Sequence, residues 1–266
     1  MEVVVLIPRY VDWNSHLICG LHEKLTDPED ALDGILYLCE TYGVNTLCMM
    51  PVFTPFVHTA SHFVLKRDRA LERIQKAYHD RLENGYKLNS KDQRLKHIKI
   101  LKAACVALEP GCHEIKDLHR LAIRLGGLDY LPIRLPITEF HDSIDLEINR
   151  LLYRAGFHLW FVSFDVACTL YPPEIIQKLM RIKDSVFQFN YRSLEDPGIR
   201  EIIQALLDRN VPVLLGTSLD CPAKAYHYDI SYYASLVEKY FSKKSQLRLM
   251  RYYTRIPSSH PKIFMI

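Results

Sequence analysis

The first cluster of side chains that could bind a metal ion or take part in catalysis is Asp12-Trp13-Asn14-Ser15-His16. It follows the first apolar run, Val3 to Ile7. A carboxylate, an amide and an imidazole stand at alternate positions, and such groups bind metal ions or hydrogen-bond a ligand. The next apolar run, Val44 to Met49, stops at Met50-Pro51-Val52. Ligands of α/β proteins lie where parallel strands end, so we expect a site at this edge.

The elements that must position these groups recur along the whole chain. Apolar runs alternate with helical patterns at intervals of about 30 to 40 residues, which favours parallel strands joined by helical crossovers. The expected strands are Val3 to Ile7, Val44 to Met49, Ile98 to Leu108, Asp129 to Pro136, His158 to Val162, Val186 to Asn190 and Val211 to Leu215. Seven such units favour one α/β domain over residues 1–266, built as a barrel.

The helices are predicted from their ends and their periodicity. Asp27 and Pro28 are an N-cap and a first helical residue, and Gly43 closes the same helix. Helices are further expected over His62 to Leu82, Glu114 to Leu125, Ser143 to Ala155, Pro172 to Ile182, Ile199 to Leu207, Ile230 to Phe241 and Gln246 to Arg251.

Composition narrows the class of protein. The 266 residues are 48% hydrophobic and 24% charged with a net charge of +3, which gives no electrostatic reason to expect nucleic-acid binding. No apolar stretch approaches the roughly 20 residues that span a bilayer. The amino terminus lacks the positive region of a signal peptide. Seven cysteines without a Cys-x-x-Cys pair suit a reducing cytoplasm, where we expect the protein to reside.

The first strand-helix-strand unit resembles the polymerase and histidinol phosphatase (PHP) superfamily, above all its bacterial protein-tyrosine phosphatases of capsule and exopolysaccharide synthesis. Those proteins read Asp-x-His-x-His, then Gly-Ile-Asp-Asp-Gly, then Thr-Pro-His. This chain reads Asp12-x-Asn14-x-His16, Gly20-Leu21-His22-Glu23-Lys24 and Met50-Pro51-Val52. The resemblance implies a distorted seven-stranded β/α barrel, similar to a TIM barrel, with several manganese, iron or zinc ions at its rim.

Most metal-ligand positions of that family are replaced in this chain. The family's Gly-x-Glu is Ala103-Ala104-Cys105, and its Ile-Glu-Phe-Pro is Ile133-Arg134-Leu135-Pro136. Its Ala-His-Pro-Glu-Arg is Val162-Ser163-Phe164-Asp165-Val166, and its Ala-Ser-Asp-x-His is Gly216-Thr217-Ser218-Leu219-Asp220. A guanidinium group cannot coordinate a cation. We therefore expect no multinuclear centre and no bound cofactor.

The resemblance and the residues together define a candidate rim pocket, without assigning catalytic residues. Its members are Asp12, Asn14, His16, His22, Cys105, Arg134, Ser163, Asp165, Ser218 and Asp220. One hypothesis is a single divalent metal ion, zinc above all, on His16, Cys105, Asp165 and Asp220. A second is that Asp165 or Asp220 pairs with Arg134. A third is an anion such as phosphate or phosphotyrosine, bound without cleavage by Arg134, Arg9, His22 and Ser218.

Three functions are open. The first is a tyrosine-phosphatase-like protein of exopolysaccharide synthesis that has lost catalysis and acts as a binding or regulatory component. The second is an active metal-dependent phosphoesterase with a smaller, rebuilt site. The third is an unrelated barrel enzyme that binds an organic ligand at the same rim. The partners expected from the resemblance are a phosphotyrosine protein, an anion or the glycan-synthesis machinery. Relatives tend to assemble, so a homo-oligomer is also open.

Overall fold

The computed structural model describes residues 11–21, 25–87, 98–125, 127–220, 224, 227–249 and 264–265. The strand expected over Val3 to Ile7 lies outside these residues, as do Arg9 and His22. Strand β1 is Val11–Ser15, so the polar motif that we expected to follow a strand is itself a strand. Asp12 and Asn14 are thereby placed inside the sheet rather than in a loop above it.

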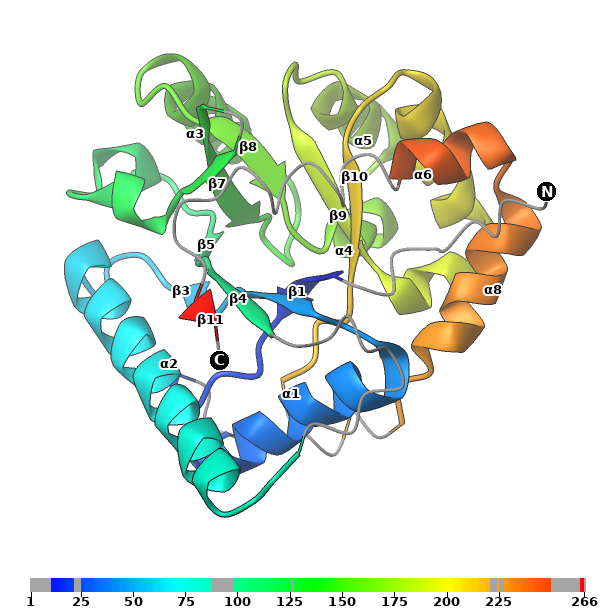
Figure 1. Cartoon of the computed structure of the whole chain (residues 1–266). Helices are drawn as coiled ribbons and strands as arrows, with labels where there is room; N and C mark the ends of the chain where they lie inside the picture. The colour runs from blue at the N-terminus through cyan, green and yellow to red at the C-terminus, as the bar shows by residue number, and fades with distance from the viewer. Residues whose placement is uncertain are drawn as a thin grey trace.

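The strands form two sheets, which are built mostly from parallel pairs (Figure 1). One sheet has the order β1-β2-β4-β11 and the other β10-β9-β8-β7-β5-β3. All pairs are parallel except β11 with β4 and β6 with β7. The bounds are β2 Thr46–Met49, β3 Val52–Phe53, β4 Lys99–Lys102, β5 Cys105–Ala107, β6 Ile123–Leu125, β7 Leu128–Arg134, β8 His158–Phe161, β9 Val186–Asn190, β10 Val213–Gly216 and β11 Phe264–Met265.

The two ends of this strand order meet where β10 passes beside β1. The backbone N–H of Ser218 donates to the carbonyl of Asn14 at 2.7 Å, and the N–H of His16 donates to the carbonyl of Leu219 at 2.8 Å. Gly216 makes the approach possible, since a Cβ atom there would lie 2.7 Å from the backbone nitrogen of Asn14. The expected α/β class with parallel strands is confirmed.

Helices follow most strands, as the repeat predicted. The bounds are α1 Pro28–Tyr42, α2 Ala60–Glu83, α3 Asp142–Tyr153, α4 Phe164–Leu170, α5 Pro173–Met180, α6 Pro197–Asp208 and α8 Ile230–Tyr240, with a further helical turn series over 243–249. The end signals of α1 are confirmed: Asp27 accepts from the N–H of Glu29, and Gly43 adopts the left-handed conformation.

Two helix expectations need correction. The segment from Glu114 to Leu125 is not an α-helix but the 3-10 turns η1 (Cys112–Glu114) and η2 (Leu118–Leu121) followed by β6. Asp117 has a positive φ between the two turns, and the β6–β7 hairpin draws the last residues into the sheet. Helix α4 was not expected, because its sequence directly continues an apolar strand.

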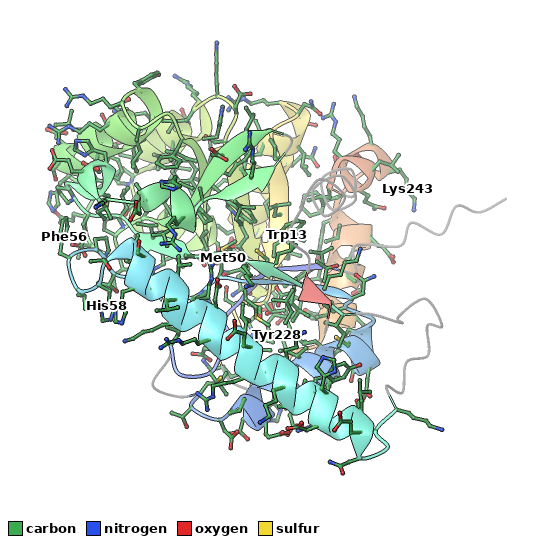
Figure 2. The ribbon with its side chains drawn as sticks, turned by 60° about the vertical axis from the view of Figure 1, so that its left-hand side comes forward. Trp13, Met50, Phe56, His58, Tyr228 and Lys243 are labelled. Carbon is green, nitrogen blue, oxygen red and sulfur yellow. The ribbon has the colours of Figure 1, made fainter. Side chains whose placement is uncertain are left out.

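Aromatic side chains fill the space between the strands and the helices. Trp13 and Trp160 are fully buried and meet edge to face, with ring centroids 5.7 Å apart. Figure 2 shows Trp13 and Met50 near the centre of the molecule, while Phe56 and His58 lie just before α2, near its N-terminal end. Among the described residues, no helix is long and apolar enough to cross a membrane.

Candidate functional site

The strand ends place one buried amide among three neighbouring strands. Asn14 Nδ2 lies 2.8 Å from Ser218 Oγ, 3.2 Å from Gln188 Oε1 and 3.4 Å from Ser163 Oγ. Gln188 also accepts from the N–H of Ser163 at 2.8 Å and donates to the carbonyl of Phe189. Asn14 and Gln188 are fully buried. We call Asn14, Ser163, Gln188 and Ser218 the amide cluster.

A break in the regular pairing of β1 sets the direction of Asn14. Val11 and Asp12 pair with Thr46 and Leu47, but Ser15 pairs with Met49. Strand β1 therefore contains one more residue than β2 over the same stretch, which is a β-bulge. Such a bulge redirects side chains, and bulges are common next to functional sites. Here the bulge falls between Asp12 and Ser15, the stretch that contains Asn14.

The Asp12 carboxylate is used to hold β10 against β1. It accepts from the N–H of Thr217 at 2.8 Å and from the Thr217 hydroxyl at 2.6 Å. It also accepts from the N–H of Asn14 at 3.2 Å. Burial raises the pKa of Asp12, and these hydrogen bonds oppose that rise in part. Both oxygens are therefore occupied within the chain.

The two serines of the amide cluster have an unusual backbone. Ser163 has φ of 51° and Ser218 has φ of 54°, in the left-handed region that residues with a side chain rarely adopt. Each follows the end of its strand, β8 or β10, and each is half-buried. Strained backbone of this kind concentrates where side chains must be held in one direction. In this backbone conformation both hydroxyl groups lie within hydrogen-bond distance of Asn14 Nδ2.

The four residues of the metal hypothesis have separate roles. Asp165 accepts from the N–H of Asn190 at 3.1 Å, and burial raises its pKa. Asp220 pairs with Lys224 at 2.6 Å. Burial raises the pKa of the Cys105 thiol to about 12, which keeps it protonated. Nowhere in the described ranges do three His, Cys, Asp or Glu side chains form a group that could hold a metal ion, so His16 does not join these three in one.

The chemistry of the donor set can also be tested against the metals that the resemblance implies. The amide cluster supplies two hydroxyls and two neutral amides in place of imidazoles and carboxylates. Asn14 Oδ1 is buried without a hydrogen-bond partner in the described chain, but a neutral amide oxygen is a poor ligand for zinc or iron. Divalent ions close together need anionic ligands to offset their repulsion. The residues at this edge do not fit a multinuclear centre.

Arg134 lies apart from the carboxylates that we expected to face it. It ends β7, its side chain is exposed, and it has no ion pair with any described residue. The expected pairing with Asp165 or Asp220 is wrong, because these carboxylates bind Asn190 and Lys224 instead. Its charge is felt at Cys105, where it lowers the thiol pKa against the larger effect of burial.

Sequence reasoning missed Gln188, Thr217 and Asn190. Asn190 caps the turn after β9 and accepts from the Tyr228 hydroxyl at 2.8 Å, which ties α8 to the same edge. A signal for Gln188 was present: it is the polar residue in the otherwise apolar stretch Val-Phe-Gln-Phe. A polar residue in a fully buried strand needs partners, and here they are Asn14 and Ser163.

The parallel strand order, with polar groups gathered where β1, β8, β9 and β10 end, defines an α/β fold with a polar cluster at one edge of its strands. No family model and no curated protein sequence matches the chain. A chain from the crystal structures of YwqE from Bacillus subtilis and CpsB from Streptococcus pneumoniae, unique metal-dependent tyrosine phosphatases, matches with a TM-score of 0.66 and 14% identity. The match covers 96% of this chain and 97% of that chain. The expected resemblance is thus confirmed at the level of the fold.

Proposed function

We propose that the protein is a phosphatase-like binding component that recognises phosphotyrosine, or a phosphate group of similar charge, without hydrolysing it. The observation that carries the proposal is the amide cluster. Asn14 occupies a position of the resemblance where the metal-dependent enzymes have histidine, and its amide is committed to Ser163, Gln188 and Ser218. The groups that would have to hold metal ions hold strands together instead.

The ends of β7, β8 and β10 support the binding of an anion. Ile133 of β7 pairs with Phe161 of β8, so Arg134 and Ser163 stand at the ends of neighbouring strands. An exposed guanidinium group forms charge-assisted hydrogen bonds with phosphate oxygens, and serine hydroxyls donate to the same oxygens. These contacts hold the anion, and we propose that the protein does no more than bind it.

The proposal extends to the architecture and the setting. The two hydrogen bonds between β1 and the segment after β10 support a closed ring of strands. The described cysteines are free, which supports a reducing compartment such as the cytoplasm. The likeness to the tyrosine phosphatases supports a regulatory role beside a phosphotyrosine protein, for which exopolysaccharide synthesis is the setting that the sequence resemblance implies.

The test combines elemental analysis, a turnover assay and a binding assay on the full chain purified without chelator. We expect less than about 0.1 equivalent of metal, no turnover of a phosphotyrosine analogue in excess manganese, and saturable binding of phosphotyrosine by calorimetry. A metal-dependent phosphatase of the same fold, assayed in parallel, is the positive control. The Arg134→Gln variant should lose most of the binding, because the neutral amide keeps the shape and removes the charge.

The active phosphoesterase is the outcome that would overturn the proposal. In that case metal would copurify near or above one equivalent, and turnover would follow its removal and return. His16→Ala would then abolish turnover, whereas the variant should change nothing in the assay if the proposal holds. Absence of any phosphotyrosine binding by a folded, metal-free protein would also overturn it.

A further inference from the structure

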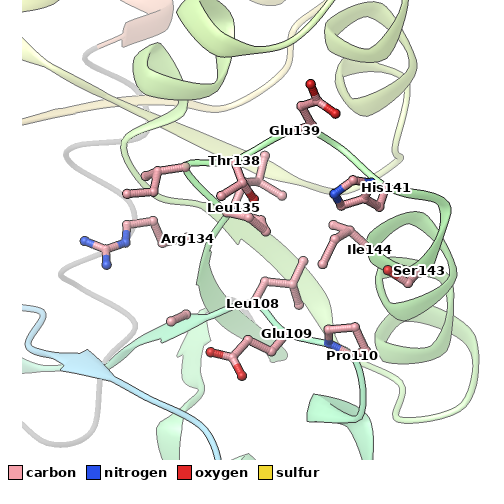
Figure 3. Close-up of a pocket in the computed structure, with 13 residues that line it drawn as sticks. Leu108, Glu109, Pro110, Arg134, Leu135, Thr138, Glu139, His141, Ser143 and Ile144 are labelled. Carbon is pink, nitrogen blue, oxygen red and sulfur yellow. The ribbon is translucent and has the colours of Figure 1, made fainter.

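A groove runs beside Arg134, between the loop after β5 and the loop that joins β7 to α3. It has a volume of about 470 Å³. Its floor is apolar and buried, with Leu108, Leu135 and Ile144, and Ile137 at its margin is 71% exposed. Figure 3 shows Leu108 and Leu135 on the two facing segments and Ile144 on the first turn of α3.

Both walls of the groove are held in place from behind. On one side the fully buried Glu147 accepts from the N–H of Gly111 at 2.9 Å and from the N–H of His113 at 2.6 Å, and the His113 ring lies 2.8 Å away. On the other side the Tyr171 hydroxyl donates to the carbonyl of Pro136. A groove with fixed walls binds with little ordering cost.

The groove is continuous with the anion position. Arg134 borders it and, in Figure 3, turns its guanidinium group away from Ile144 and Pro110. Carboxylates line the rest of the margin: Glu109 on the loop after β5 and Glu139 on the loop before α3. A ligand that reaches Arg134 with an anion therefore also meets an apolar surface and two carboxylates in the same groove.

We propose, resting on the phosphotyrosine binding proposed above, that this groove receives the polypeptide next to the phosphotyrosine. Its preferred occupant is an extended segment with a large aliphatic residue beside the phosphotyrosine and a basic residue beyond it. The aliphatic side chain packs on Leu108, Leu135 and Ile137. The basic side chain faces Glu109 and Glu139. The groove thus sets the sequence preference, and Arg134 sets the requirement for phosphate.

The test measures three probes by calorimetry: phosphotyrosine itself, a phosphotyrosine peptide with leucine and lysine in those places, and the same peptide with glycine and glutamate. Burial of one leucine side chain is worth roughly 1.5 to 3 kcal/mol, about ten-fold or more in affinity. We expect the leucine-lysine peptide to bind at least about ten-fold more tightly than the glycine-glutamate peptide.

Two variants and one matched control locate the preference. Ile137→Asp should remove the preference for leucine, and Glu139→Lys should reverse the preference for lysine. Leu247→Asp changes another exposed aliphatic residue, 57% exposed and remote in sequence from the groove, and should change neither preference. All three positions are exposed, so the variants should remain folded, which circular dichroism would verify.

The outcomes separate this inference from the function on which it rests. If the chain binds phosphotyrosine but both peptides bind equally, the groove inference fails and the proposed function stands. If no probe binds, the proposed function fails first. If Ile137→Asp dissociates a dimer in sedimentation and leaves peptide binding unchanged, the groove is occupied by a second copy, with its exposed Phe56 and Val57 as the matching surface, and the inference is overturned.

Discussion

Two parts of the same strand edge use their polar residues in opposite ways. Where β1, β8, β9 and β10 end, Asn14 and Gln188 are fully buried and their amide groups bind other strands. Where β5 and β7 end, Arg134 and Glu139 are exposed beside an apolar groove. Polar groups that satisfy one another stabilise the fold but leave little for a ligand. The recognition that we propose therefore lies on the β5–β7 side.

The largest effect should come from the buried carboxylate behind the groove. Glu147→Ala would leave the partly buried backbone N–H groups of Gly111 and His113 without their acceptor, at a cost of about 3 to 4 kcal/mol in the free energy of unfolding. Urea denaturation measures this. Glu147→Gln keeps one acceptor oxygen and should lose less, and Glu201→Ala on exposed surface should lose almost nothing. Equal stability of the alanine variant and wild type would show that the wall does not depend on Glu147.

The next effect tests the contact that joins β10 to β1. A methyl group at Gly216 would lie 2.7 Å from both Cβ and N of Asn14, so Gly216→Ala must separate the strands and should cost about 2 to 3 kcal/mol. Gly198→Ala is the matched control and should cost less. Its new methyl group would meet only the side chain of Asp196, at 3.3 Å, and not a backbone atom. An unchanged urea midpoint for Gly216→Ala would mean that this part of the edge is looser than its hydrogen bonds imply.

A smaller effect is expected from the amide cluster itself. Asn14→Ala removes the donor shared by Ser218 and Gln188 and should lower the free energy of unfolding by about 1 to 2 kcal/mol. Peptide preference in the groove should not change, because the groove walls do not contact Asn14. Loss of the leucine-lysine preference in this variant would break the division between the two parts of the edge.

The smallest effect is a change in the pH dependence of stability. Burial raises the pKa of Asp165 above its ordinary value of 3.8, so its ionisation is less favourable in the folded state. Its contribution to stability is complete below the unfolded pKa and is lost as the pH rises through the folded one. Asp165→Asn keeps an acceptor for Asn190 and should gain Tm relative to wild type between about pH 4 and pH 7. A difference in Tm that stays constant over this range would contradict the assignment.

Local signals in the sequence predicted more of the fold than of the site. Asp27, Pro28 and Gly43 act on their own neighbours, so the ends of α1 could be read directly. The position of β1 could not, because its pairing with β2 and its contact with β10 decide it. Helix α4 was missed for a related reason: its N-cap is Ser163, whose left-handed backbone turns the chain immediately after β8.

The candidate residues show the same division between local and distant causes. Asn14 and Ser218 were selected for their places near strand ends, and the structure brings them together although they are 204 residues apart. Arg134 was selected correctly as an edge residue, but its supposed partners were claimed by Asn190 and Lys224. Which polar groups satisfy one another depends on side-chain directions that spacing along the chain does not specify.

Strand β11 has a consequence for the order in which the chain can fold during synthesis. Phe264 and Met265 pair with Ile100 and Lys99 of β4, the strand that joins β2 on its other side. The ribosome therefore makes β1, β2 and β4 long before the residues that complete the outer edge of their sheet exist. Until then that edge offers unpaired backbone groups to any neighbouring nascent chain. Within this sheet, β4 is therefore the strand that waits longest for its second partner.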